Sequence, residues 1–168
     1  MVNYSVFRQA QIKHLWSVRE GFFRQTYQLT DGNYSYGMLS YSGFLYPSAQ
    51  IDTARTTWIV RKTGMSIMEV IDPEGYVTAT IERKWFSSKI IFTATDGFTA
   101  IYYKPSFWHR GFEWITEDGQ VLLIQETSGF SQTHNFTYGD LPYEQPYLLL
   151  LSFLAIEFNL RRRRGAAV

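Results

Sequence analysis

Toward its C-terminal end the chain carries one long apolar run, Tyr147-Leu-Leu-Leu-Leu-Ser-Phe-Leu-Ala-Ile-Glu-Phe-Asn-Leu160. Most of these residues are good helix formers, and the preceding Pro146 suits the start of a helix because the first turn needs no N–H from it. Coiled into a helix, the run presents apolar residues on every side, a pattern typical of burial in a core. We therefore predict a buried helix over 147–160.

A C-terminal membrane anchor flanked by arginines is the alternative interpretation of the same run. Fourteen residues rise about 21 Å as a helix, whereas the core of a bilayer is about 30 Å thick and needs about 20 apolar residues. Glu157 and Asn159 also interrupt the apolar character of the run. We therefore expect no transmembrane span, and a helix that belongs to a folded core.

The middle of the chain alternates strand-like stretches with turns that contain Asp and Gly. These turns are Asp31-Gly32, Asp72-Pro-Glu-Gly75, Asp96-Gly97 and Asp118-Gly119, and the last three glycines are 22 residues apart. Asp-Gly between alternating apolar residues is a strong hairpin signal, because glycine tolerates the positive φ of a tight turn. The pattern predicts an antiparallel meander of roughly ten to twelve strands, with the turn aspartates bonded to local backbone.

Aromatic residues make up 18% of the chain, and such bulky rings favour strands and fill wide interiors. In a chain of strands, a helix that is apolar on all sides is covered most economically by a closed barrel. Closure also removes the exposed sheet edges that invite aggregation. We predict a mainly β fold with one barrel domain over residues 1–160, its helix at 147–160, and a basic C-terminal tail over 161–168.

Two segments carry a resemblance to a known family. Ile71-Asp-Pro-Glu-Gly-Tyr-Val-Thr-Ala-Thr-Ile-Glu-Arg-Lys-Trp-Phe-Ser87 combines an Asp, a turn Gly, an apolar alternation and a basic residue before an apolar-Ser ending, and Ile115 to Val121 repeats the turn. Together with the late apolar helix, these features resemble the tubby C-terminal-like superfamily, which includes the LURP-one-related proteins and the phospholipid scramblases. The resemblance implies a closed antiparallel β-barrel of about twelve strands around a hydrophobic C-terminal helix.

Members of that superfamily differ in function. Tubby domains bind phosphoinositide head groups, and scramblases are linked to lipid movement with calcium. This chain matches neither the lipid-binding lysine and arginine constellation nor a calcium-binding segment rich in Asp. The resemblance therefore implies a non-enzymatic binding or scaffold domain, with an anionic phospholipid head group or another phosphorylated ligand as its candidate partner at the membrane surface.

Five basic residues lie between successive hairpin turns and are candidates for an anion site: Arg83, Lys84, Lys89, Lys104 and Arg110. If they converge in the fold, their guanidinium and ammonium groups pair with phosphate oxygens of a head group. The alternative is that each is a solvated residue at the end of a strand. The sequence leaves both interpretations open.

Four consecutive arginines, Arg161 to Arg164, directly follow the predicted helix. Positive charge there complements the negative end of the helix dipole and helps to place that end at the barrel mouth. Near an anionic leaflet each basic residue also adds about 1 kcal/mol of attraction, so a membrane-surface role is the second hypothesis. Removing these four charges from the formal net charge of +1 leaves −3, so we expect no nucleic-acid partner.

Enzymatic and metal chemistry find little support in the sequence. The chain has no cysteine, and His14, His109 and His134 lack the short spacings of a metal site. No nucleophile elbow, P-loop or dinucleotide-binding motif occurs, although a carboxylate pair for glycoside hydrolysis stays formally possible. We predict a protein that is not an enzyme and uses no metal and no cofactor.

Two alternative functions remain. The first is a protein interaction domain that uses exposed aromatic residues such as Trp85, Phe107 and Trp108, which a contiguous apolar patch would support. The second is an enzyme whose site the sequence does not reveal. The residues Met1 to Ser5 lack a basic region followed by an apolar one, so no secretory signal is expected. The expected location is cytoplasmic, with peripheral contact to the membrane if the lipid hypothesis holds.

Overall fold

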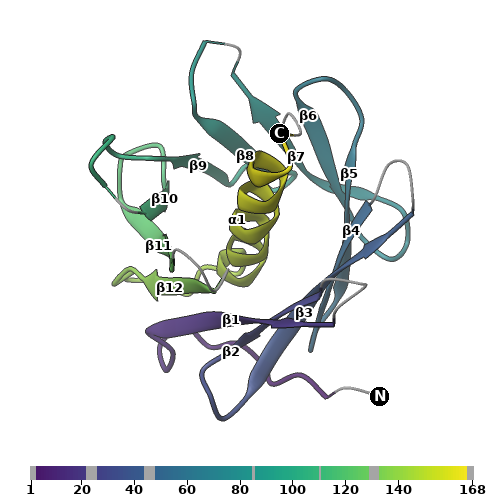
Figure 1. The fold of residues 1–168 in the computed structure, drawn as a ribbon, viewed down its shortest axis with the longest axis vertical. Helices are drawn as coiled ribbons and strands as arrows, with labels where there is room; N and C mark the ends of the chain where they lie inside the picture. Colours follow the sequence, from purple (N-terminus) through teal and green to yellow (C-terminus); the bar gives the residue numbers. More distant parts are fainter. Residues whose placement is uncertain are drawn as a thin grey trace.

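A computed structural model of the chain describes residues 3–21, 26–43, 48–84, 86–109, 111–128 and 133–165. Twelve strands form a closed antiparallel barrel, and one helix follows them within these residues, as predicted (Figure 1). Each strand pairs with its neighbour in sequence, and β1 closes the ring against β12. In chain order the elements are β1 His14–Glu20, β2 Thr26–Thr30, β3 Ser35–Ser42, β4 Ser48–Thr53, β5 Thr57–Lys62, β6 Ile67–Ile71, β7 Val77–Arg83, β8 Ile90–Ala94, β9 Thr99–Tyr103, β10 Gly111–Ile115, β11 Val121–Thr127, β12 His134–Tyr138 and α1 Leu148–Arg163.

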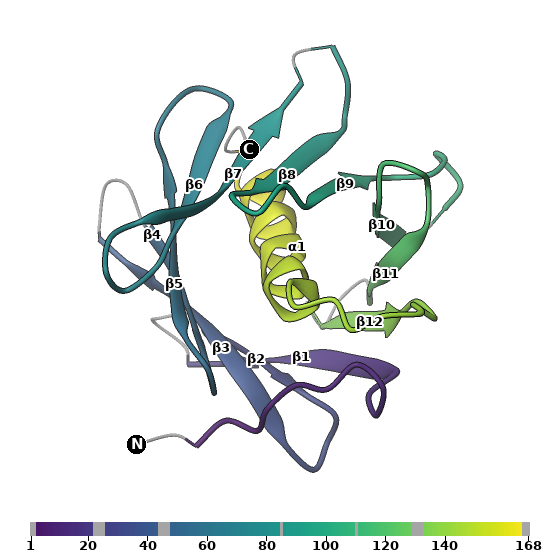
Figure 2. The ribbon, with the colours of Figure 1, turned by 180° about the vertical axis from the view of Figure 1, so that it is seen from behind.

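The helix α1 lies in the middle of the ring of strands, as both views show (Figures 1 and 2). Every residue from Leu148 to Leu160 is buried, which confirms the predicted core helix. Two hydrogen bonds orient it: the indole Nε1 of Trp114 donates to the carbonyl of Leu151 at 2.9 Å, and the Tyr138 and Ser152 hydroxyls are 2.8 Å apart. The helix continues to Arg163, so the predicted end at Leu160 is wrong by three residues.

The meander places successive connections alternately at the two ends of the barrel. One end, called here the arginine mouth, carries the connections that follow β5, β7 and β9 together with Arg161–Arg164. The other end, called the turn mouth, carries the connections that follow β6, β8 and β10 and the segments 3–13 and 139–147.

Tyr147 anchors the start of α1 at the turn mouth. Its ring stacks on Phe98 with centroids 5.1 Å apart, and its hydroxyl donates to Asp96 at 2.6 Å.

The turns at the turn mouth are built as predicted. Gly75, Gly97 and Gly119 have φ values of +93°, +92° and +86°, a region that side chains disfavour and glycine occupies freely. The Asp72 carboxylate accepts the N–H of Tyr76 at 2.8 Å, the Asp96 carboxylate accepts the N–H of Phe98 at 3.0 Å, and the Asp118 carboxylate accepts the Thr116 hydroxyl proton. The prediction that the turn aspartates have a structural role is therefore confirmed for these contacts.

A charge placed inside the barrel tests the central position of α1. Phe153 is fully buried, and burying an unpaired carboxylate costs several kcal/mol, a large part of the roughly 5–15 kcal/mol that stabilises a domain. We expect Phe153→Asp, and likewise Leu150→Asp, to yield no soluble folded protein by circular dichroism and size-exclusion chromatography. Phe153→Leu is the control and should fold. A folded Phe153→Asp protein with an unchanged melting temperature would rule out the buried helix.

Candidate functional site

Four of the five basic residues predicted to form an anion site lie at or near the arginine mouth. Arg83 ends β7 and Lys84 follows it, Lys89 precedes β8, Lys104 follows β9, and all four are exposed. Arg110 lies outside the described residues. Because the connections after β7 and β9 are alternate connections of the meander, these four residues share one end of the barrel with the arginines of α1. The sequence indicated this convergence, because the residues lie between successive turns and alternate connections of a meander lie at the same end of the barrel.

Large apolar side chains are exposed at the same mouth. We call Met65, Phe86, Phe107 and Trp108 the apolar tips, with exposed fractions of 76%, 104%, 84% and 88%. They come from the connections after β5, β7 and β9. The sequence had suggested Phe107 and Trp108, and it had also suggested Trp85, which lies outside the described residues. Large apolar side chains exposed at one end of a molecule are candidates for contact with another apolar phase or partner.

A depression of about 500 Å³ lies on the outer wall beside the connection after β7. Its floor is formed by Ile91 and Ile101, which pair across β8 and β9 and face outward. Lys84 and Lys89 lie at its edge, whereas the other two described residues of the predicted basic set do not line it. The lining residues are Glu82, Lys84, Phe86, Ser87, Lys89, Ile91 and Ile101.

The arginines that follow the apolar run contact the inner wall of the mouth. The Nε of Arg161 is 2.5 Å from a Glu157 carboxylate oxygen. The guanidinium of Arg162 lies 4.2 Å from the centre of the Phe112 ring, and that of Arg164 lies 5.2 Å from the centre of the Tyr41 ring. These contacts support the structural role that was hypothesised for the arginines, because they attach the last turn of α1 to the barrel. Only Arg161 is largely covered, and the other three arginines are exposed.

Glu157 is a buried carboxylate with two partners. Its side chain is 1% exposed, one oxygen accepts the Tyr41 hydroxyl proton, and the other pairs with Arg161. Burial, and next the negative charge of Glu157, raise the pKa of the Tyr41 hydroxyl, so it stays a donor. A buried carboxylate without such partners would be strongly destabilising. The polar interruption of the helix therefore marks a fixed ion pair at the arginine mouth.

His134 belongs to a second buried network near this mouth. Its Nδ1 accepts a hydrogen bond from the Gln125 amide nitrogen at 3.0 Å, and the Gln125 oxygen accepts the Tyr102 hydroxyl proton at 2.6 Å. Burial, with a smaller effect of the Arg163 charge, lowers the pKa of His134 to about 4. The imidazole is therefore neutral at pH 7, with its proton on Nε2, a buried atom that has no hydrogen-bond partner among the described residues.

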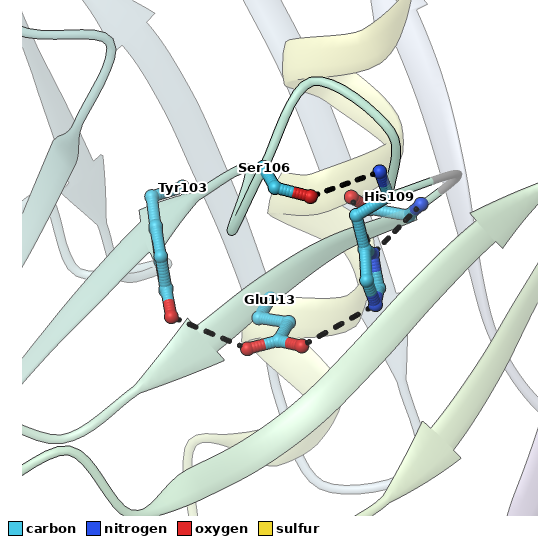
Figure 3. A network of polar contacts seen from close by, with 5 residues as sticks. Tyr103, Ser106, His109 and Glu113 are labelled. Carbon is cyan, nitrogen blue, oxygen red and sulfur yellow. Dashed lines mark hydrogen bonds and ion pairs between the residues drawn. The ribbon is translucent and has the colours of Figure 1, made fainter.

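A third polar network positions the connection after β9 (Figure 3). The Glu113 carboxylate accepts the Tyr103 hydroxyl proton at 3.4 Å and lies 3.9 Å from the His109 Nε2. The backbone N–H of His109 donates to the Ser106 hydroxyl at 3.2 Å, and the N–H of Gly111 donates to the imidazole Nδ1 at 3.2 Å. The network links His109 of this connection to Glu113 of β10, and the bond between His109 and Ser106 closes a turn that contains two of the apolar tips, Phe107 and Trp108.

The three histidines occupy separate surroundings. His109 and His134 belong to the networks described above, and the His14 Nδ1 lies 3.2 Å from the Thr137 hydroxyl at the turn mouth. Among the described residues, no three His, Cys, Asp or Glu side chains are placed to hold one metal ion. In the same part of the chain, no helix combines the length and the apolar character needed to cross a bilayer.

Comparison of the chain with models of known protein families and with curated protein sequences finds no match in either. The class of the protein is given by its fold, a closed twelve-stranded antiparallel barrel filled by its C-terminal helix. This is the architecture that the resemblance to the tubby C-terminal-like superfamily implies. Membership of that superfamily stays a prediction.

His134 gives the folding stability a pH dependence whose sign follows from its lowered pKa. Between the folded value of about 4 and the ordinary value of 6.5, the unfolded chain binds a proton that the folded protein does not. Stability is therefore lost as the pH falls through this window, by about 3 kcal/mol at about 1.4 kcal/mol per pH unit. Urea denaturation at pH 7 and pH 4 should show this extra loss relative to His134→Gln. Equal losses in the two proteins would contradict the assignment.

Proposed function

We propose that the protein is a non-enzymatic binding domain of tubby-like type that docks onto anionic membrane surfaces through its arginine mouth. One observation carries the proposal: the four apolar tips and the exposed basic residues lie at the same end of the barrel. The basic residues concerned are Lys84, Lys89, Lys104 and Arg162–Arg164.

The two kinds of residue suit the two layers of a membrane surface. Each basic residue near an anionic leaflet contributes about 1 kcal/mol, and this attraction falls off within a Debye length of about 8–10 Å at moderate salt. Each apolar tip that enters the interface adds part of the roughly 1.5–3 kcal/mol gained when a large apolar side chain leaves water. Aromatic residues such as Trp108 also prefer the level of the lipid head groups.

The depression on the outer wall also combines apolar and basic side chains. Ile91 and Ile101 offer an apolar floor, while Lys84 and Lys89 offer ammonium groups at its edge. A phospholipid presents an acyl chain and a phosphate in the same relation, so this depression is a candidate head-group site. The cation–π contact of Lys89 with Tyr103, at 5.8 Å, orders one of these ammonium groups.

A protein partner is the second candidate for the apolar tips, because interaction surfaces also gather aromatic residues. The basic residues beside the apolar tips favour a membrane over a protein partner. A typical protein interface excludes lysine from its core, whereas here Lys104 lies 5.8 Å from the ring centre of one apolar tip, Phe107. An enzyme is less well supported, because the buried carboxylate at this mouth, Glu157, is already bound by Tyr41 and Arg161.

Vesicle flotation tests the proposal. Wild-type protein should float with vesicles of phosphatidylserine and phosphatidylcholine but not with phosphatidylcholine alone, and binding should weaken as NaCl rises from about 0.1 M to about 0.5 M. Phe86→Ser/Phe107→Ser/Trp108→Ser should bind about tenfold or more weakly, since each lost 1.4 kcal/mol is a factor of about ten. A membrane role therefore predicts both a preference for vesicles that contain phosphatidylserine and a loss of vesicle binding when the apolar tips are removed.

The matched control changes two exposed aromatic residues at the turn mouth. Tyr34→Ser/Tyr76→Ser removes side chains that are 60% and 72% exposed and should bind like wild type. Arg162→Ala/Arg163→Ala/Arg164→Ala tests the charges while keeping Arg161, the partner of Glu157. If the tip variant and the turn-mouth control float equally well, or wild type ignores lipid charge, the membrane proposal is wrong and a protein partner becomes the better account.

A further inference from the structure

A second cleft lies at the turn mouth, on the opposite end of the barrel from the proposed membrane surface. It has a volume of about 550 Å³ and opens to solvent between residues 8–13, Arg55 and residues 141–144. A smaller depression of about 60 Å³ shares Arg55 with it and reaches Leu149 in the first turn of α1. The cleft therefore brings together three segments that are far apart in the sequence. Its volume is typical of sites for small molecules.

The walls of this cleft are fixed before any ligand arrives. Gln9 is buried, and its side-chain oxygen accepts the backbone N–H of Gln145 at 3.1 Å. The side-chain oxygen of Gln145 in turn accepts the N–H of Tyr147 at 3.2 Å, next to the start of α1. Lys13 pairs with Asp140 across the same two segments. These contacts hold residues 8–13 against residues 139–147, so binding requires little ordering of the chain.

Two guanidinium groups in the cleft lack an acidic partner among the described residues. They belong to Arg8 and Arg55, which both line the cleft and are exposed. Among the described residues that line the cleft, Glu144 is the one acidic residue. A planar guanidinium matches the two oxygens of a carboxylate or phosphate, and an exposed arginine without a partner is ready to bind such an anion.

The remaining lining is apolar on one side. Leu141, Pro142 and Tyr143 lie side by side in the sequence and face the cleft together. We propose that this cleft binds a small amphipathic anion, with a carboxylate or phosphate monoester paired to Arg8 and Arg55 and an apolar or aromatic body against Leu141, Pro142 and Tyr143. This site is independent of membrane docking, because it lies at the other mouth of a barrel whose interior is filled by α1.

Binding of defined probes to the full chain tests this site. Phenyl phosphate and phenylacetate carry the two head groups on one aromatic body, 2-phenylethanol lacks the charge, and inorganic phosphate lacks the body. We expect at least one of the two aromatic anions to bind with a dissociation constant of about 1 mM or below, as measured by protein-observed NMR titration. We expect 2-phenylethanol and inorganic phosphate to bind at least about tenfold more weakly. Which anion binds better identifies the head group.

Variants assign the binding to the cleft. Arg8→Ala/Arg55→Ala should weaken the aromatic anion about tenfold or more, and Tyr143→Ser should weaken the aromatic anion while leaving inorganic phosphate unchanged. Arg83→Ala/Lys104→Ala at the opposite mouth is the matched control and should bind the probes like wild type. The Arg8→Ala/Arg55→Ala protein should also keep its vesicle binding, which separates this cleft from the membrane surface.

Several results would overturn the proposal. The proposal is wrong if neither aromatic anion binds wild type, or if 2-phenylethanol binds as tightly as the anions. It is also wrong if the cleft variant and the opposite-mouth control bind the anions equally well. Both arginines are exposed, and neither pairs with an acidic residue in the described part of the chain, so the cleft variant should keep the wild-type melting temperature. If it does not, the Tyr143→Ser comparison decides: equal binding of the aromatic anion by Tyr143→Ser and wild type rules the site out.

Discussion

The burial of α1 on all sides is the constraint from which the rest of the structure follows. A single sheet face covers one side of a helix, so a helix without a polar side needs a closed ring of strands. The twelve strands supply that ring, and every residue from Leu148 to Leu160 is removed from water. Inside the apolar core, two hydrogen bonds fix the rotation of the helix about its axis and its position along the barrel: one from Trp114 to Leu151 and one between Tyr138 and Ser152.

A barrel filled in this way offers its mouths and outer wall for binding rather than its interior. The direction of α1 makes the two mouths different. At one mouth the last turn of the helix brings a row of arginines, and the inward-facing Glu157 pairs with Arg161 and accepts a hydrogen bond from Tyr41. At the other mouth, residues 139–147 return to the helix start and meet the segment 3–13. The proposed membrane surface and the proposed anion cleft follow from this difference.

Much of the fold could be predicted from the sequence, because its signals are local. The absence of an amphipathic pattern predicted a buried helix, and the Asp-Gly turns predicted the meander. The helix end was wrong because Arg161 pairs with Glu157 four residues earlier, a spacing that extends helices. The exposure of Phe86 was not predictable, because no periodicity of the sequence marks the side chains at a loop tip. The cleft was not predictable, since it depends on residues 8–13 meeting residues 141–144, a contact that only the closed ring creates.

Hydrogen exchange of the α1 amides, measured by NMR under native conditions, tests the central position of the helix most directly. A helix enclosed by the barrel opens only when the barrel opens, so the amides of residues 151–160 should exchange with a free energy equal to that of global unfolding. They should be protected at least as well as the central residues of β7 and β8. Exchange of these amides at a markedly lower free energy than the strands, as in a helix that detaches by itself, would contradict the account.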